Sequence, residues 1–270
     1  MSNNDKNNEM QISEAELRSM TAHMEEMHEE TFPVLASHLQ DLGASIRTKT
    51  AEIGARRSSR RTFFAGSGVV AGGLLLAACG SSDSGTATPS ASASTGGSAD
   101  DKAALATNAS LEALAVFAYD AALKAAPMGK FGKTVPAAIA EFATVAKKQH
   151  QDHQDAFNAD LVAAGGKAFT DPDPALAATV TKMFGDVNDV VGLAKLALTL
   201  ENTAAATYIQ QMSTLMSPMA LSAVATIAPV EQQHSAILNF VLGEYPVPDT
   251  FVKLGPTPTS LGARPSTDAG

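Results

Sequence analysis

Two glutamates recur with a tyrosine at the same spacing in two distant segments of the chain. Glu112 is followed seven residues later by Tyr119, and Glu201 is followed seven residues later by Tyr208. At about 100° per residue, seven residues fall about 20° short of two helical turns, so each glutamate would share a helix face with its tyrosine. Both glutamates lie within runs of Ala, Leu and Val. A carboxylate buried in such surroundings needs a hydrogen-bonding partner or a cation.

Two other segments carry ionisable residues three positions apart, His150 with His153 and Glu231 with His234. Residues at i and i+3 share a helix face, so each pair offers two metal ligands. One such pair is usually solvated, and a lone tyrosine in a bundle is usually an ordinary core residue. Here the four motifs form a weak internal repeat. Glu112 with Tyr119 corresponds to Glu201 with Tyr208, and His150 with His153 corresponds to Glu231 with His234. All histidines after residue 79 lie in these two pairs.

Together the motifs resemble the ferritin-like family of di-iron and di-manganese carboxylate proteins over residues 101–250, because that family places one Glu on each of two helices and Glu-x-x-His on the other two. The resemblance implies that iron or manganese binds between the helices of an all-α, ferritin-like four-helix bundle with a long crossover between helices 2 and 3. It also implies that Tyr119 and Tyr208 donate hydrogen bonds to bridging carboxylates and fix their orientation. The ligands it implies, with His150 in the place of one glutamate, are Glu112, His150, His153, Glu201, Glu231 and His234.

His150 stands where the family has its first bridging glutamate, while Glu231 corresponds to the other bridge. One imidazole nitrogen binds one metal, so we do not expect His150 to bridge two ions as a carboxylate does. Three glutamates supply a ligand charge of −3, where four would supply −4. The site should therefore be asymmetric, prefer metals that favour nitrogen ligands, or bind a metal ion well at only one of its two positions. Asp152 points about 100° away from the ligand face, so it is not expected to substitute.

Apolar periodicity predicts helices for all four motif segments, with a further short helix near 175–184. The connection between the second and third, residues 165–186, is long, and the other two are short. That pattern is typical of a four-helix bundle with one crossover, which we place at residues 101–243. The four predicted helices span 102–126, 135–164, 187–215 and 219–242.

The segments flanking the bundle have other compositions. Residues 79–100, rich in Ser and Gly, are typical of a flexible tether. Residues 244–270 contain five prolines and should pack loosely or be disordered near the end. The cytoplasmic leader, residues 1–55, should form two short amphipathic helices separated by Pro33, with His23 and His28 on a solvated face.

Residues 56–78 have the three parts of a secretory signal, namely a basic block, an uncharged run from Thr62 and small residues before Cys79. The stretch around Arg60 and Arg61 resembles a twin-arginine motif, and the four residues ending at Cys79 resemble a lipoprotein box. The resemblance implies export of a folded chain by the twin-arginine machinery, cleavage before Cys79 and lipidation of its thiol. Two acyl chains suffice for stable anchoring. The plain alternative is a buried structural cysteine.

Composition excludes several classes of protein. A single cysteine cannot form a disulfide within the chain. With 28 acidic and 19 basic residues and a net charge of −9, the chain lacks the basic surface of a nucleic-acid partner. Many tethered chains in one closed cage could not all face a single membrane, so we expect a monomer or a dimer.

The leading hypothesis is a lipid-anchored protein on the outer face of the cytoplasmic membrane or in the cell envelope. It would bind iron or manganese and act as an oxidoreductase toward oxygen or peroxide, with no catalytic residue assigned. The second hypothesis is a non-catalytic metal-binding or structural lipoprotein. The third is a metal-free bundle that presents a surface to an envelope partner, for which buried Glu and His would be costly.

Overall fold

The computed structural model describes residues 12–66, 99–132 and 134–269, with the backbone alone for residues 42–66. Every element in these ranges is helical, apart from one isolated bridge between Thr257 and Ser260. The predicted all-α fold is therefore confirmed. Within the described ranges, no helix combines the length and the apolar character needed to cross a membrane.

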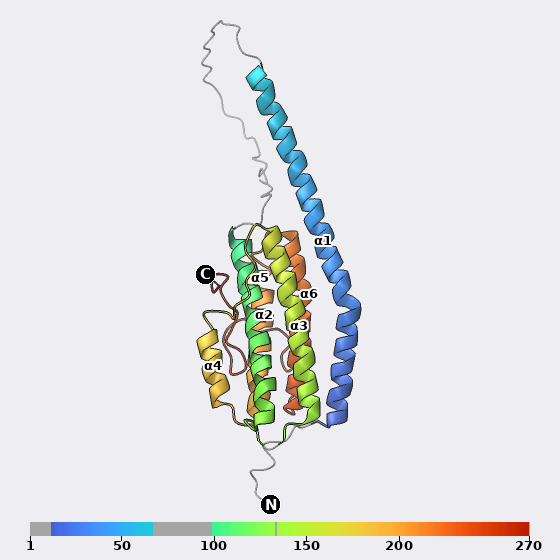
Figure 1. The fold of residues 1–270 in the computed structure, drawn as a ribbon, viewed down its shortest axis with the longest axis vertical. Helices are drawn as coiled ribbons and strands as arrows, with labels where there is room; N and C mark the ends of the chain where they lie inside the picture. The colour runs from blue at the N-terminus through green and yellow to red at the C-terminus, as the bar shows by residue number, and fades with distance from the viewer. Residues whose placement is uncertain (1–11, 67–98, 133, 270) are drawn as a thin grey trace, which may run out of the picture. The chain divides into compact units, whose positions relative to one another are not determined.

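Four long helices lie side by side and form the bundle (Figure 1). Helix α2 packs along α3, and α5 packs along α6. The long connection falls between α3 and α5, as the short, long, short spacing predicted. Their bounds are Ala99–Ala125 for α2, Ala137–Ala163 for α3, Val190–Gln211 for α5 and Pro218–Val241 for α6.

The crossover contains the short helix α4, Ala177–Asp186, and is fixed to α2 by Asp173. The Asp173 amide donates to the Ser110 carbonyl at 2.9 Å, and the Ser110 hydroxyl donates to the Asp173 carboxylate at 3.1 Å. The other carboxylate oxygen of Asp173 accepts from the amides of Ala175 and Leu176 just before α4. One buried aspartate thus connects the start of α4 to the bundle.

Two apolar clusters fill the bundle interior, with a polar layer between them. The first includes Leu105, Phe157 and Ile227, and the second includes Phe142 and Leu238. Each fully buried side chain of this size contributes about 1.5–3 kcal/mol to folding. The many alanines between them let the helix backbones approach closely. These clusters provide the stability needed to hold a layer of charged groups out of water.

The C-terminal tail lies against the bundle, which differs from the expectation of loose packing. The Thr203 and Thr207 hydroxyls on α5 accept hydrogen bonds from the amides of Leu261 and Arg264, both at 3.0 Å. The Thr107 hydroxyl on α2 donates to the Ser266 carbonyl at 2.9 Å. These buried threonine hydroxyls therefore anchor the C-terminal tail to α2 and α5.

The N-terminal segment forms one helix, α1 (Glu14–Gly66), which continues through Pro33 where we expected two helices. A proline inside a helix removes one backbone hydrogen bond and is tolerated where neighbouring turns are stabilised. Residues up to 43 belong to the same compact unit as the bundle, and residues 44–95 form another, described here only as the helix to Gly66. Cys79 and the side chains of Arg60 and Arg61 lie outside the described residues.

Candidate metal centre

The structure brings all six candidate ligands together in the polar layer of the bundle, where none is more than 1% exposed. They form two groups of four, and in each group one ligand atom per residue lies within 4.8 Å of all the others. His150 and Glu231 belong to both groups. The first group adds Glu112 and His153, and the second adds Glu201 and His234.

Helical spacing explains how four helices supply six ligands. Helices α3 and α6 each present two side chains from successive turns of one face, because i and i+3 lie about 60° apart. Helices α2 and α5 each present a single glutamate from a row of alanines and leucines. The result is a pair of adjoining clusters, each with two carboxylates and two imidazoles.

Glu231 belongs to both ligand groups, and neither of its carboxylate oxygens accepts a well-aligned hydrogen bond within the described residues. Its side chain is fully buried. One oxygen is 2.9 Å from His153 Nδ1, and the other is 3.6 Å from His234 Nδ1. A carboxylate buried this deeply needs a cation beside it, either a charged imidazole or a metal ion. Cations on both sides of Glu231 would satisfy both oxygens, so the residues present fit a pair of metal ions.

His150 lies between the two groups and directs one ring nitrogen to each. Its Nδ1 is 2.7 Å from the nearer oxygen of Glu112, and its Nε2 is 3.2 Å from the nearer oxygen of Glu201. The same Nδ1 is 3.7 Å from Glu231. The imidazole therefore takes the position of a bridging group, although a neutral ring can give only one nitrogen to a metal.

The two tyrosines cross between the halves of the internal repeat. Tyr119 donates to Glu201 at 2.5 Å, and Tyr208 donates to Glu112 at 2.6 Å. The resemblance assigned both hydroxyls to bridging carboxylates, but neither donates to Glu231. Helices α2 and α5 run antiparallel, so the tyrosine seven residues after one glutamate reaches the level of the other. Each phenol fixes the orientation of the carboxylate opposite it.

Electrostatics within the layer favour ion pairs. Burial by itself would lower the pKa of His150, but Glu201, Glu231 and Glu112 raise that pKa well above its ordinary value. Burial likewise opposes the charged form of His153, yet Glu112 and Glu231 raise its pKa to about 9. Burial would raise the pKa of Glu112, but His153 and His150 lower it to about 2.

Charge on the three imidazoles, whose pKa values are all raised, would balance the carboxylates of the metal-free layer. Metal ions would have to displace the protons of the imidazoles they bind, since a ligating nitrogen is deprotonated. A set of carboxylates and imidazoles suits iron, manganese and zinc better than soft metals that select thiolates.

Two residues near the centre were not identified from the sequence. Gln149 is 1% exposed, and its Oε1 lies 2.7 Å from His234 Nε2, the nitrogen that faces away from the carboxylates. It would therefore hold the tautomer that leaves Nδ1 free for a metal. A signal was present in the sequence, because Gln149 lies four residues before His153 and so about 40° from it around α3.

His28 differs from the expectation that it lies on a solvated face. It is 7% exposed, its Nε2 is 3.3 Å from Asp152, and its ring centre is 5.4 Å from that of His153. His23 is exposed, as expected. A signal was present in the sequence, because Leu17, Met24 and His28 follow the three-and-four spacing of one helix face.

Comparison with known proteins gives one family. The family described as "Ferritin-like domain" matches residues 100–244, which include all six candidate ligands. Neither the curated proteins nor the solved structures contain a match.

Proposed function

Because the chain belongs to the ferritin-like domain family, we propose that its buried layer binds two divalent metal ions, iron or manganese, and that the loaded protein acts as an oxidoreductase toward oxygen or peroxide. The observation that carries the proposal is Glu231, a fully buried carboxylate that lies in both ligand groups and has the imidazoles of His150, His153 and His234 within 2.9–3.7 Å.

The roles of the ligands follow from the geometry. Glu112 and His153 would hold one ion, Glu201 and His234 the other, and Glu231 would serve both. Bound iron or manganese would supply Lewis acidity and one-electron redox chemistry. Tyr119 and Tyr208 would keep the terminal carboxylates in place, and the apolar clusters on either side of the layer would limit access of water.

A second function, metal binding without turnover, is favoured by one observation. His150 replaces a carboxylate at the centre, and its ring contacts glutamates of both groups. In the metal-free protein it can serve as an internal cation, and this would favour slow or partial loading. The site would then serve metal capture or stability of the bundle.

Elemental analysis of the full chain, purified without added chelator, tests metal binding. We expect iron or manganese in the wild type and a loss of most of it in Glu231→Gln. The matched control is Glu141→Gln, which changes a glutamate on α3 whose side chain is half exposed and pairs with Arg18. Equal metal content in all three proteins, or none in the wild type, would refute the proposal. Oxygen and peroxide consumption by the loaded protein then separates the two functions.

We also propose that the chain is exported and lipid-anchored through Cys79, which would leave the bundle outside the cytoplasmic membrane as a monomer or dimer. The support is the order of the basic block, the uncharged run and the cysteine in the sequence. Replacing Arg60 and Arg61 by lysine should block export. The same replacement at Arg56 and Arg57 provides a matched control, and Cys79→Ser should release the chain from the membrane fraction. Export that is insensitive to the first pair would contradict the twin-arginine assignment.

A further inference from the structure

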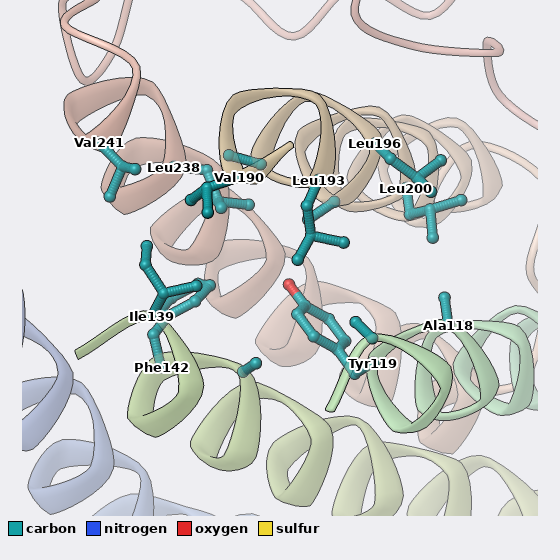
Figure 2. Close-up of a pocket in the computed structure, with 14 residues that line it drawn as sticks. Ala118, Tyr119, Ile139, Phe142, Val190, Leu193, Leu196, Leu200, Leu238 and Val241 are labelled. Atoms are coloured by element: carbon teal, nitrogen blue, oxygen red, sulfur yellow. The ribbon is translucent and has the colours of Figure 1, made fainter. Parts of the chain in front are cut away.

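An apolar cavity, partly open to the surface, lies beside the candidate metal centre between helices α2, α3, α5 and α6 (Figure 2). Its volume is about 40 Å³. Apart from Tyr119, its walls consist only of alanine, valine, leucine, isoleucine and phenylalanine side chains. Figure 2 shows Tyr119 reaching from α2 toward Leu193 of α5, with Ile139 and Phe142 of α3 beside it. Most of its wall belongs to the second apolar cluster, next to the polar layer, and Ala118 and Leu200 belong to the first.

The cavity is large enough for water but unsuited to it. A volume of roughly 10–15 Å³ holds one water, provided that two to four polar partners surround it. The only side-chain polar group in the wall is the Tyr119 hydroxyl, whose proton is already donated to Glu201. A water here would lack partners, as would hydrogen peroxide. An apolar wall of this kind disfavours water and accepts small apolar molecules.

Tyr119 connects the cavity to the centre. Its ring lines the cavity and stacks on His150 with ring centres 5.6 Å apart. Its hydroxyl holds the candidate ligand Glu201. A molecule in the cavity would therefore be separated from the ligand layer by a single side chain.

We propose that this cavity is a binding site for dioxygen, held next to the metal centre on the Tyr119 side. The choice of occupant rests on the proposed function, and it selects oxygen rather than peroxide as the oxidant that the protein admits. The binding itself depends only on the size and the apolar wall of the cavity, so it can be tested without metal.

The test uses the metal-free full chain with labelled methyl groups, studied by NMR under oxygen pressure and under argon. Dioxygen is paramagnetic and speeds relaxation of nearby methyl signals. We expect the methyls of Ile139, Val190 and Leu238 to relax severalfold faster under oxygen than those of Leu105 and Ile227, which are also buried but lie in the other cluster. Equal enhancement in both clusters would overturn the proposal.

A filling variant adds a second criterion. Ala194 lines the cavity, so Ala194→Leu should abolish the difference between the clusters, whereas Ala205→Leu, at an equally small buried site of α5 outside the cavity, should retain it. If Ala194→Leu does not fold, Ala118→Val replaces it in the test, because it adds a smaller group to the same cavity. An unchanged enhancement in a folded filling variant refutes the assignment. Elemental analysis tests the metal separately, so failure of the metal proposal and failure of the cavity are distinguishable.

A different observation concerns α1. We infer that its residues 14–39 cover the α3 side of the metal centre. Leu17 and Met24 are at most 1% exposed and belong to the same apolar cluster as Phe142 of α3. On either side of this apolar contact, Arg18 pairs with Glu141 at 2.9 Å and Lys148 pairs with Glu29 at 2.8 Å.

The cover reaches the residues around the ligands. The Met24 carbonyl accepts from Gln149 Nε2 at 3.5 Å, and the other end of that amide faces His234. His28 and Phe32 lie over the ring of His153, with ring centres 5.4 and 6.2 Å away. Moving α1 away would uncover Gln149 and His153 together. The partner of this α3 face is thus the chain's own N-terminal helix, which the proposed cleavage before Cys79 would remove.

Hydrogen exchange of the full chain tests the cover. In Leu17→Glu/Met24→Glu, exchange in α1 and the adjoining face of α3 should rise roughly a hundredfold, because two buried apolar contacts are lost. Exchange in α5 should not change, and Val34→Glu, at a site that is 67% exposed, should behave as wild type. Uptake of Co²⁺ should quicken in the double variant alone. Exchange in wild-type α1 as fast as in an unstructured peptide would overturn the inference, as would unchanged Co²⁺ uptake in an opened variant. Arg18→Glu, which opposes Glu141, replaces the double variant if that fails to fold.

Discussion

Replacing His150 by glutamate would give the layer the four carboxylates that the family resemblance implies. In the metal-free protein, three glutamates face three histidines whose pKa values are all raised. The layer is then close to neutral. His150→Glu removes a cation that lies 2.7 Å from Glu112, 3.2 Å from Glu201 and 3.7 Å from Glu231. It also adds a fourth carboxylate with only two imidazoliums left to balance it.

The expected cost is large because the group is buried. Breaking a buried ion pair by removing one partner costs about 3–5 kcal/mol. For a domain of this size, each kcal/mol lowers the Tm by about 2–4 °C, so the metal-free variant should melt about 6–20 °C below wild type. Two divalent ions carry a charge of +4 and would balance four carboxylates. The metal-loaded variant should therefore recover most of the loss and show a larger Tm increase on metal addition than wild type.

Thermal unfolding with chelator and with added Mn²⁺ measures both effects. His150→Gln is the control, because it removes the cation without adding a carboxylate. It should destabilise the metal-free protein without enlarging the response to Mn²⁺. The reasoning would be refuted by a His150→Glu variant that is as stable as wild type in chelator, or by one whose response to Mn²⁺ is no larger than that of the control.

Three further predictions concern the polar residues of the bundle. Without metal, the stability contributed by His153 is fully present below pH 6.5 and lost as the pH rises through about 9, while that of Glu112 is present above pH 4.5 and lost as the pH falls through about 2. Urea unfolding in chelator should therefore show the largest combined contribution between about pH 4.5 and 6.5, and an optimum above pH 8 would contradict this. Tyr208→Phe and Tyr119→Phe should each cost about 1.5–3 kcal/mol in urea unfolding, because each removes a hydrogen bond to a buried carboxylate, and a near-zero cost would contradict the crossed pairing. Burial raises the pKa of Asp160 to about 7, so Asp160→Asn should stabilise the protein by about 1–3 kcal/mol at pH 8 and by much less at pH 3.5; an equal gain at both values would exclude ionisation as the cause.

The sequence alone determined the elements of the bundle and the residue types in its polar layer. Apolar periodicity, with Pro127, Gly165 and Pro218 at the boundaries, predicted all four helices to within three residues, except at the end of α5, where the difference is four. The i, i+3 pairs fixed which side chains share a face, because that relation depends only on helix geometry. These are local properties, and the sequence contains them in full.

The tertiary structure decided which faces meet. The hydrogen bond from Tyr119 to Glu201 depends on how far α2 and α5 are shifted along each other. This shift is set by packing across the whole bundle. The same holds for Gln149, whose contact with His234 joins two helices without a shared spacing rule. His28 is buried only because α1 lies along α3. Contacts between helices depend on the register of distant segments, which no short stretch of sequence specifies.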